Sequence, residues 1–426
     1  MRKTTFLLAA SIMLLGLSGC TQYGQLVQSD KTRDTSPAVD QVDFAALVDG
    51  NNAFAFELYE TLRQEEGNLF LSPYSISEAL AMAYAGTRGE TEKDMAQVLN
   101  FNLSQDRLHP AWNSLDLQLN ERNQSAEQDE GEGFQLNVVN AIWGQQGYDF
   151  LDEYLDVLAQ NYGAGLRIVD FINETEQSRI TINQWVSDQT GGKIEDLVPP
   201  GAIDTLTRLV LTNAVYFNAN WFHPFDTRKT AAGLFYLLDG SSVTTPMMQR
   251  TESFCYAEGA SYQAVELPYE GGETSMVILL PVAGQFDTFE ESLGADLVRG
   301  IIGDLEGRRV TLKMPKFEYE SSFSLQQALS AMGMEVAFTP LQADFSGMNG
   351  GYEPLWISEV IHKAFVSVNE SGTEAAAASA ITMPPSATSP PQPKELTIDR
   401  PFIFLIRDIP TGSTIFIGRV LNPAAR

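Results

Sequence analysis

The side chains that most often carry out enzyme chemistry are few in this chain, and they do not form a recognisable catalytic centre. The three histidines, His109, His223 and His362, are far apart, and none lies near a Gly-x-Ser-x-Gly elbow or at metal-ligand spacing. The two cysteines, Cys20 and Cys255, are too few for a disulfide framework or a cysteine-rich zinc site. We therefore predict that the protein is not an enzyme and needs neither a metal nor a cofactor.

The most informative segment lies between residues 371 and 397. A run of small residues (GTEAAAASA) is followed by a proline-rich stretch (MPPSATSPPQP) that can form neither a helix nor a central strand. After Lys394, the chain has two apolar runs, 402–407 and 414–420, and two strands cannot form a domain of their own. They must complete the main core, so the segment is predicted to be a long loop inside one domain. Loops of that length are usually functional or disordered.

The elements that must hold this loop alternate along the chain without a second linker. Apolar residues at helical spacing predict helices at 44–62, 91–99, 152–162 and 174–188, and Ser72-Pro73 predicts the start of another, with Ser72 as its N-cap. Apolar runs of strand length predict strands at 134–143, 206–217, 262–267, 275–280, 309–315, 364–368, 402–407 and 414–420. This mixed order, with many strands in the C-terminal half, predicts an α+β fold with large sheets.

The N-terminus has the pattern of a targeting signal. Two basic residues precede an apolar run, 6–17, that is too short to span a bilayer. The sequence LSGC, which ends at Cys20, resembles the bacterial lipobox, so residues 1–19 are predicted to be a lipoprotein signal peptide and Cys20 the lipidated N-terminus. An ordinary secretory signal is the alternative. Residues 20–41 are polar and aperiodic, which predicts a flexible tether to the bacterial cell envelope, at the outer membrane or cell surface.

The charge balance limits the partners. The chain has 27 Lys and Arg against 55 Asp and Glu, a net charge of −28. Such a surface repels nucleic-acid phosphates and anionic lipid headgroups, so no nucleic acid is expected as a partner. After the signal peptide no stretch is apolar enough to span a membrane, so membrane contact is expected only through the lipid. We expect a monomer.

Several short motifs, in order, make the chain resemble the serpin family from about residue 44 to residue 423. They are NLFLSPYSI (68–76), LTNAVYF (211–217) with Trp221, MPKF (314–317), HKA (362–364), VNESGTEAA (368–376), DRPFIF (399–404) and GRVLNP (418–423). Each motif is weak alone, but the whole set in this order is specific. The resemblance implies one domain, 42–426, with three β-sheets, about nine helices and an exposed reactive-centre loop at about 370–397.

The resemblance also implies a function, inhibition of serine proteases by a suicide-substrate mechanism. In such a mechanism the protease cleaves the loop and forms an acyl-enzyme, and the loop then inserts into the central sheet before deacylation. The native form would be metastable. The competing interpretation is a non-inhibitory serpin that acts as a protease substrate or binding protein on the cell envelope.

The hinge that starts this loop suits insertion. By the resemblance it comprises Glu370, Gly372, Thr373, Glu374, Ala375, Ala376, Ala377 and Ala378. Alternate residues of an inserted strand face a crowded interior, and those on one face are small or apolar: Thr373, Ala375, Ala377, Ser379 and Ile381. The charged Glu374 falls on the opposite face, where water can solvate it.

The reactive bond is predicted from the family spacing at Ser386-Ala387, and the next two bonds remain alternatives because the loop is longer than in common members. Small residues at these bonds suggest an elastase-like or subtilisin-like serine protease, with a cysteine protease as a further class. The adjacent prolines Pro384 and Pro385 depart from the usual pattern, and they would remove hydrogen-bond donors from the last part of an inserted strand.

Four more residues take roles from the resemblance. Ser72, Asn213 and His362 map to the cluster that controls opening of the sheet, and Trp221 maps beneath the point where the loop enters it. Each is equally a good buried polar or aromatic residue. Activation by heparin-like polyanions is not expected, because the region where activated members carry a basic helix is acidic here, at 127–132.

Overall fold

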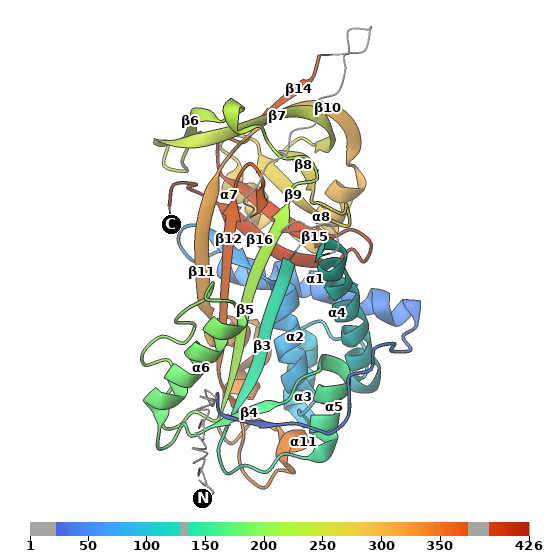
Figure 1. Cartoon of the computed structure of the whole chain (residues 1–426), viewed down its shortest axis with the longest axis vertical. Coiled ribbons are helices and arrows are strands. Elements are labelled where there is room, and N and C mark those ends of the chain that lie inside the picture. The colour runs from blue at the N-terminus through green and yellow to red at the C-terminus, as the bar shows by residue number, and fades with distance from the viewer. Residues whose placement is uncertain (1–22, 128–134, 374–391, 426) are drawn as a thin grey trace, which may run out of the picture.

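The computed structural model describes residues 23–127, 135–373 and 392–425. Within them, most of the longer helices pack beside one large sheet (Figure 1). The helices are α1 (Gln41–Leu62), α2 (Pro73–Tyr84), α3 (Gly89–Val98), α4 (Gln105–Glu127), α5 (Asp152–Tyr162), α6 (Thr175–Gln189), α7 (Phe286–Glu291), α8 (Ala295–Gly303), α9 (Gln326–Leu329), α10 (Glu335–Phe338) and α11 (Ser346–Asn349), with short turns η1 (Thr227–Lys229) and η2 (Ser330–Met334). All of the helices predicted above are present, and the predicted N-cap Ser72 accepts a hydrogen bond from the Ser75 amide at 3.3 Å.

The first sheet holds the site. Its strands lie in the order β1 (Gln25–Val27), β4 (Leu166–Val169), β3 (Gln135–Gln145), β5 (Leu209–Asn220), β13 (Gly372–Thr373), β12 (Ile357–Val368) and β11 (Phe317–Ser324). The central strand β5 is buried at every residue except its last, because both of its faces are covered. It pairs directly with β12 in parallel up to Tyr216 and Phe365, and β13 separates the two strands only beyond that level.

The second sheet forms the other half of the molecule. Its path is β14 (Lys394–Thr397), β10 (Glu306–Pro315), β7 (Ser242–Glu258), β8 (Tyr262–Pro268), β9 (Thr274–Pro281), β15 (Phe402–Asp408), β16 (Thr414–Val420) and β2 (Leu69–Leu71), and β6 (Ala231–Tyr236) pairs with β7. Three sheets were expected. The long strand β7 pairs with β6 and β10 and, by its end, with β8, so two groups of strands join into one hydrogen-bonded path.

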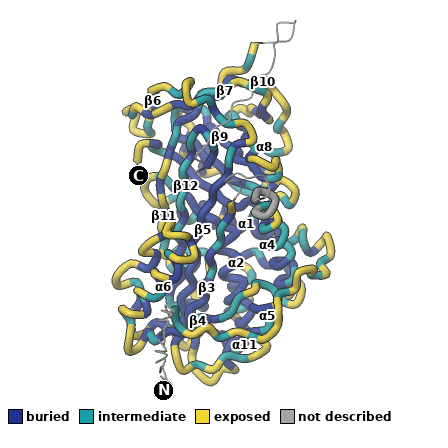
Figure 2. Tube along the Cα trace, viewed as in Figure 1, coloured by how far each residue is buried: buried dark blue, intermediate teal, exposed yellow. Residues whose placement is uncertain are grey.

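The core runs the length of the molecule between the sheets and the helices. Figure 2 shows buried chain along β3, β5, β12 and α2, and exposed chain along the outer turns. Every residue of α2 is buried, so this helix crosses the interior behind the first sheet. Among the described residues, no helix combines the length and apolarity needed to cross a bilayer.

The prediction of a flexible tether at residues 20–41 is wrong for the described part of that segment. Gln25–Val27 form β1, which pairs antiparallel with β4 at the edge of the first sheet. The following residues lie against the helices: Lys31 pairs with Asp156 of α5 at 2.6 Å, and the Asp34 amide donates to the Gln160 carbonyl at 2.9 Å. A polar segment without periodicity is thus held by backbone pairing and ion pairs, which need no apolar face.

Arg33 is the main side-chain anchor of this segment, and its removal should loosen it. Its guanidinium donates to Asp116 at 2.5 Å and to Asn113 at 2.8 Å, and it is about three-quarters buried. Because Arg33→Ala leaves the largely buried Asp116 without its cation, we expect the free energy of unfolding to fall by about 1–3 kcal/mol. The matched control, Lys31→Ala, removes a more exposed pair and should change the free energy of unfolding less than Arg33→Ala does. Urea unfolding measures both, and equal effects would contradict this role of Arg33.

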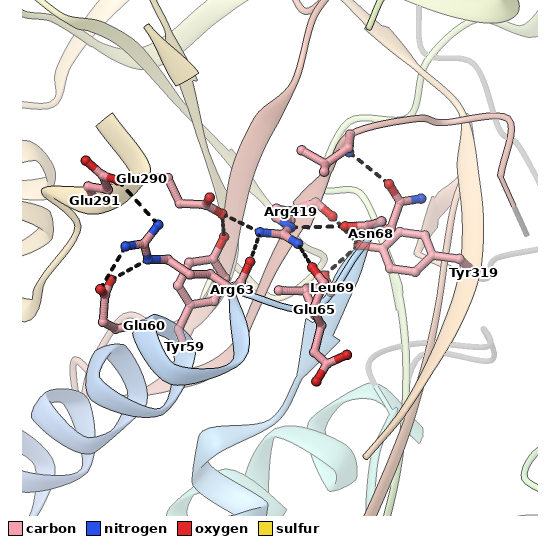
Figure 3. A network of polar contacts seen from close by, with 12 residues as sticks. Tyr59, Glu60, Arg63, Glu65, Asn68, Leu69, Glu290, Glu291, Tyr319 and Arg419 are labelled. Atoms are coloured by element: carbon pink, nitrogen blue, oxygen red, sulfur yellow. Dashed lines mark hydrogen bonds and ion pairs between the residues drawn. The ribbon is translucent and has the colours of Figure 1, made fainter. Parts of the chain in front are cut away.

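A buried arginine fastens the C-terminal strand to the first helix (Figure 3). Arg419 of β16 pairs with Glu290 at 3.0 Å, and both side chains are about 95% buried. The same guanidinium donates to the backbone carbonyls of Arg63 at 2.8 Å and Gly67 at 3.0 Å, and to that of Glu65. The turn between α1 and β2 is therefore built around this one cation.

Candidate functional site

The hinge is already part of the sheet. Gly372 pairs with Asn220 and Thr373 with Ala219 on β5, and Thr373 also pairs with Val368 on β12. The Thr373 side chain is fully buried. A Cβ atom on residue 372 would lie 2.0 Å from the Ala219 carbonyl oxygen, so the close approach of the two strands requires glycine there.

The first residue of the hinge, Glu370, is held by an ion pair and a hydrogen bond. Glu370 pairs with Lys316 at 2.8 Å and accepts a hydrogen bond from the Thr230 hydroxyl at 2.7 Å. Its own carbonyl accepts from the Phe225 amide at 2.8 Å. Burial raises the pKa of Glu370, but the hydrogen bonds from Lys316 and Thr230 outweigh it and hold the pKa below its usual value. Glu370 is thus ionised at neutral pH, and it fixes where the loop leaves the sheet.

Trp221 lies directly against the hinge. Its indole N–H donates to the Asn369 carbonyl at 3.0 Å, and its amide donates to the Ser371 carbonyl at 2.8 Å. Its ring stacks on Tyr269 with centroids 4.7 Å apart, and the Tyr269 hydroxyl lies 2.8 Å from the Thr373 hydroxyl. Trp221 and Tyr269 therefore hold the chain from Asn369 to Thr373 in place.

Farther along the boundary between β5 and β12, the structure brings Ser72, Asn213 and His362 together. His362 and Asn213 stand opposite each other on β12 and β5, and the His362 Nδ1 is hydrogen-bonded to the Asn213 side-chain oxygen. The Ser72 amide donates to His362 Nε2 at 3.3 Å, and the Ser72 hydroxyl donates to the Ile415 carbonyl at 2.8 Å. The Asn213–His362 contact spans the boundary between β5 and β12.

Sequence reasoning missed three members of this cluster. The Asn213 amide donates to Ser75 and to Asn140, which lies opposite it on β3. Asn140 in turn donates to Glu78 of α2 at 2.8 Å. The one signal was a polar Asn140 inside a predicted apolar strand. A chain of hydrogen-bonded side chains thus crosses the adjacent strands β12, β5 and β3 and ends on the buried helix α2.

Burial keeps His362 neutral. It lowers the pKa of the imidazole to about 3. Because Nε2 accepts from the Ser72 amide, the single ring proton belongs on Nδ1, which donates to Asn213. A second proton, on Nε2, would point at the Ser72 N–H and break this contact.

Acid should therefore destabilise the native state through His362. The pKa of His362 in the folded state lies below its unfolded value of about 6.5, so the folded state loses stability as the pH falls from 6.5 toward 3. By pH 4.5 the free energy of unfolding should have fallen by about 2–3 kcal/mol. We expect the free energy of unfolding in urea to depend less on pH in His362→Gln than in the parent. His109, whose pKa burial lowers to about 4, titrates in both proteins. Parallel pH curves for the two would contradict this assignment.

The other predicted site residues are distributed as follows. Glu374 to Ala378, the predicted reactive bond Ser386-Ala387 and Cys20 lie outside the described residues. His109 is buried beside the Tyr162 hydroxyl at 2.7 Å. Within the described ranges, no three His, Cys, Asp or Glu side chains gather as a metal site would require.

The α+β fold of two large sheets, with a loop hinge inserted at one end of the first, is that of a protease-inhibitor family. A family model described as Serpin (serine protease inhibitor) matches residues 49–423, and the chain belongs to the serpin family. The predicted family and fold are confirmed.

Particular relatives cover most or all of the chain. An uncharacterized serpin-like protein of Thermococcus kodakarensis is 38% identical over 99% of this chain and 99% of its own length. Leukocyte elastase inhibitor A of Mus musculus is 38% identical over 88% of this chain and 99% of its own. The crystal structure of a thermophilic serpin, Tengpin, in the native state has a TM-score of 0.81 at 28% identity, covering 93% of this chain and 100% of that one. These similarities support protease inhibition as the general function.

Proposed function

We propose that the protein traps serine proteases as a suicide substrate. The peptide bond Ser386-Ala387 breaks, Ala387 leaves as a free amine, and the Ser386 carbonyl carbon becomes an ester of the protease's catalytic serine. The freed loop then enters the sheet between β5 and β12 before water hydrolyses the ester. In this scheme the protease supplies the catalytic groups, and the chain is its substrate and its trap.

The observation that carries this proposal is the position of β13. Gly372 and Thr373 already occupy the first two places of an additional strand, antiparallel to both neighbours. Below them β5 and β12 are joined by a parallel ladder from Leu209 to Tyr216. Insertion exchanges this one parallel ladder for two antiparallel ones. Each added hydrogen bond is worth about 0.5–1.5 kcal/mol, so the inserted state is the more stable.

Insertion also provides the displacement that traps the protease. About fifteen residues at about 3.3 Å each carry an attached protease on the order of 50 Å along the sheet. The hydrogen-bonded side chains of Asn213 and His362 must separate on the way, because they join the two strands between which the loop passes. The cluster therefore sets how readily the sheet opens.

The proposed targets are elastase-like or subtilisin-like serine proteases. Small residues around Ser386 suit shallow specificity pockets. The similarity to leukocyte elastase inhibitors supports the same class.

The test is to incubate residues 21–426 with an elastase and a subtilisin and to analyse the products on denaturing gels. A complex that survives denaturation, with a released peptide that starts at Ala387, is the expected result. Cleavage without complex, repeated across a wider set of proteases, would instead favour a non-inhibitory serpin and implicate Pro384 and Pro385.

We also propose that Cys20 carries a lipid that anchors the protein to the bacterial cell envelope. The described chain supports this through the position of β1, which begins at Gln25, close after Cys20, at the end of the molecule opposite to β14 (Figure 1). An anchor there would present the loop-bearing end away from the membrane. In a bacterial host, Cys20→Ala should move the protein from the membrane to the soluble fraction, and unchanged membrane association would contradict the anchor.

A further inference from the structure

Three residues on one side of the buried helix α2 are hydrogen-bonded to three neighbouring strands of the first sheet. The helix packs against β3 and β5 (Figure 1). Its N-cap Ser72, Ser75 and Glu78 lie three residues apart, which places them on the same side of a helix. Ser72 contacts β12, Ser75 contacts β5, and Glu78 contacts β3. One helix therefore binds the strands on both sides of the boundary between β5 and β12.

These contacts form one continuous series of hydrogen bonds that ends on Glu78. The Ser72 amide donates to His362, and His362 donates to Asn213. Asn213 donates to Asn140, and Asn140 donates to the Glu78 carboxyl at 2.8 Å. Because the Ser72 amide is a donor and the Glu78 oxygen is an acceptor, every step runs in the same direction. Glu78 therefore supplies the acceptor at the end of the series.

The β12 side of the boundary is held by the second sheet. β12 pairs with β11, and two side chains of β11 are bonded to β2. The Tyr319 hydroxyl donates to the Leu69 carbonyl at 2.9 Å, and the Ser321 hydroxyl accepts from the Phe70 amide at 3.1 Å. On the other side, β3 and β5 pair with each other from Gln135 to Gly144. Opening of the boundary should therefore move β3 and β5 together, away from β12 and across α2.

This movement breaks the hydrogen bond between Asn140 and Glu78. The Ser75 carbonyl is a second acceptor for Asn140, but at 3.2 Å it is the more distant one. Glu78 is 7% exposed, and burial and the charge of Asp116 raise its pKa well above the usual value, although Arg33 and Asn140 lower it. A protonated carboxyl still accepts through its other oxygen, so the contact with Asn140 does not need a charge.

We propose that Glu78 is a positioning residue for loop insertion. By accepting the hydrogen bond from Asn140, it holds β3 and β5 on α2 at the level where Asn213 meets His362. It thereby keeps the boundary with β12 closed until the loop is cleaved. Glu78 acts through Asn140 and takes no part in the attack by the protease. This inference rests on the proposed function, because it takes opening of this boundary as a step of the mechanism.

Amide hydrogen exchange of the uncleaved protein measures this closure without a protease. Glu78→Leu removes the acceptor, and Glu78→Gln keeps an uncharged one. The matched control is Ser77→Ala, because Ser77 is buried on the same helix and its hydroxyl has no hydrogen-bond partner among the described residues. We expect the amides of β12 to exchange about tenfold faster in Glu78→Leu and within about twofold of the parent in the other two variants. The amides of β15, in the second sheet, should exchange alike in all four proteins.

A double-mutant cycle tests whether Glu78 acts through Asn140. Asn140→Ala alone should accelerate exchange in β12 about as much as Glu78→Leu does, so the test does not depend on one variant. When Asn140→Ala is already present, adding Glu78→Leu should change that exchange by less than about twofold, because the hydrogen bond is already lost. A tenfold effect of Glu78→Leu in both backgrounds would overturn the proposed role.

Three further results of the exchange experiment would overturn the inference. Equal exchange of β12 in Glu78→Leu and the parent would show that Glu78 does not close the boundary. Equal acceleration in β12 and β15 would show that it stabilises the fold as a whole. A Glu78→Gln variant that exchanges like Glu78→Leu would show that an acceptor is not what this position supplies.

Assays of trapping separate this inference from the proposed function. A parent that is cleaved but never trapped overturns the suicide mechanism, whereas the exchange data still decide whether Glu78 closes the boundary. In a parent that traps proteases, inhibitory activity should be lost about tenfold faster from Glu78→Leu during incubation without a protease, since an open boundary admits the uncleaved loop. An unchanged rate of loss would overturn the role of Glu78 in insertion.

Discussion

Replacing Thr373 by Arg is expected to turn the protein from an inhibitor into a substrate of the same protease. Thr373 is fully buried between β5 and β12, and its hydroxyl lies 2.8 Å from that of Tyr269. A guanidinium at this position would lie in an apolar interior without a partner, which costs several kcal/mol. We therefore expect the variant's hinge to lie outside the sheet before cleavage, so that loop insertion meets this cost. Loop insertion would then be slower than hydrolysis of the acyl-enzyme.

The measurement is the number of inhibitor molecules consumed per protease trapped. We expect it to rise from about one to more than about ten, because a slowing of insertion by only 1.4 kcal/mol already changes the partition tenfold. Thr373→Ser is the matched control, since it keeps the hydroxyl and adds no charge, and it should inhibit like the parent. Full trapping by Thr373→Arg would show that insertion past this position is not required.

Replacing Arg419 by Met is expected to produce the largest loss of stability. The substitution keeps most of the side-chain length but removes the cation that pairs with Glu290 and binds the carbonyls of Arg63 and Gly67 (Figure 3). Glu290 would then be left as a buried, unpaired carboxylate beside the Tyr59 hydroxyl. Breaking a buried pair in this way costs about 3–5 kcal/mol.

A double-mutant cycle separates the lost pair from the lost packing. Glu290→Gln combined with Arg419→Met removes both charges, so we expect it to be more stable than Arg419→Met alone. Urea unfolding gives the free energy of unfolding of all three variants. If the double variant is less stable by the full sum of the two single losses, the two residues act independently and the pair is not the cause.

The first prediction concerns the balance between the native sheet and the sheet with an added strand, and the second concerns the stability of the native fold. Thr373 occupies the second place of that strand, and the hydrogen bond between Asn213 and His362 joins β5 and β12 farther along their boundary. Arg419 belongs to the second sheet, so its loss should weaken the native fold without changing that boundary itself.

Local patterns were sufficient for five helices and eight strands, but they missed the long helix α4 and the long strand β7. Residues 152–162 were predicted as a helix from apolar spacing, and α5 has the same bounds. The placement of the last two strands followed from a simple constraint, because two strands after Lys394 must complete a core that the preceding chain had begun, and β15 and β16 lie inside the second sheet. Such features are readable because periodicity reports which face of an element is buried, and proline and chain length limit what a segment can form.

The sequence by itself determined the family, about half of the helices and strands, and a hinge of residues small enough to enter a sheet. Only the tertiary structure decided which polar residues meet: Asn140 and Asn213 are 73 residues apart, and Asn213 and His362 are 149 apart. It also decided that Gln25–Val27 form an edge strand, which is too short to show periodicity. The physical reason is that strand register and edge pairing depend on backbone partners far away in the chain, and no local pattern encodes them.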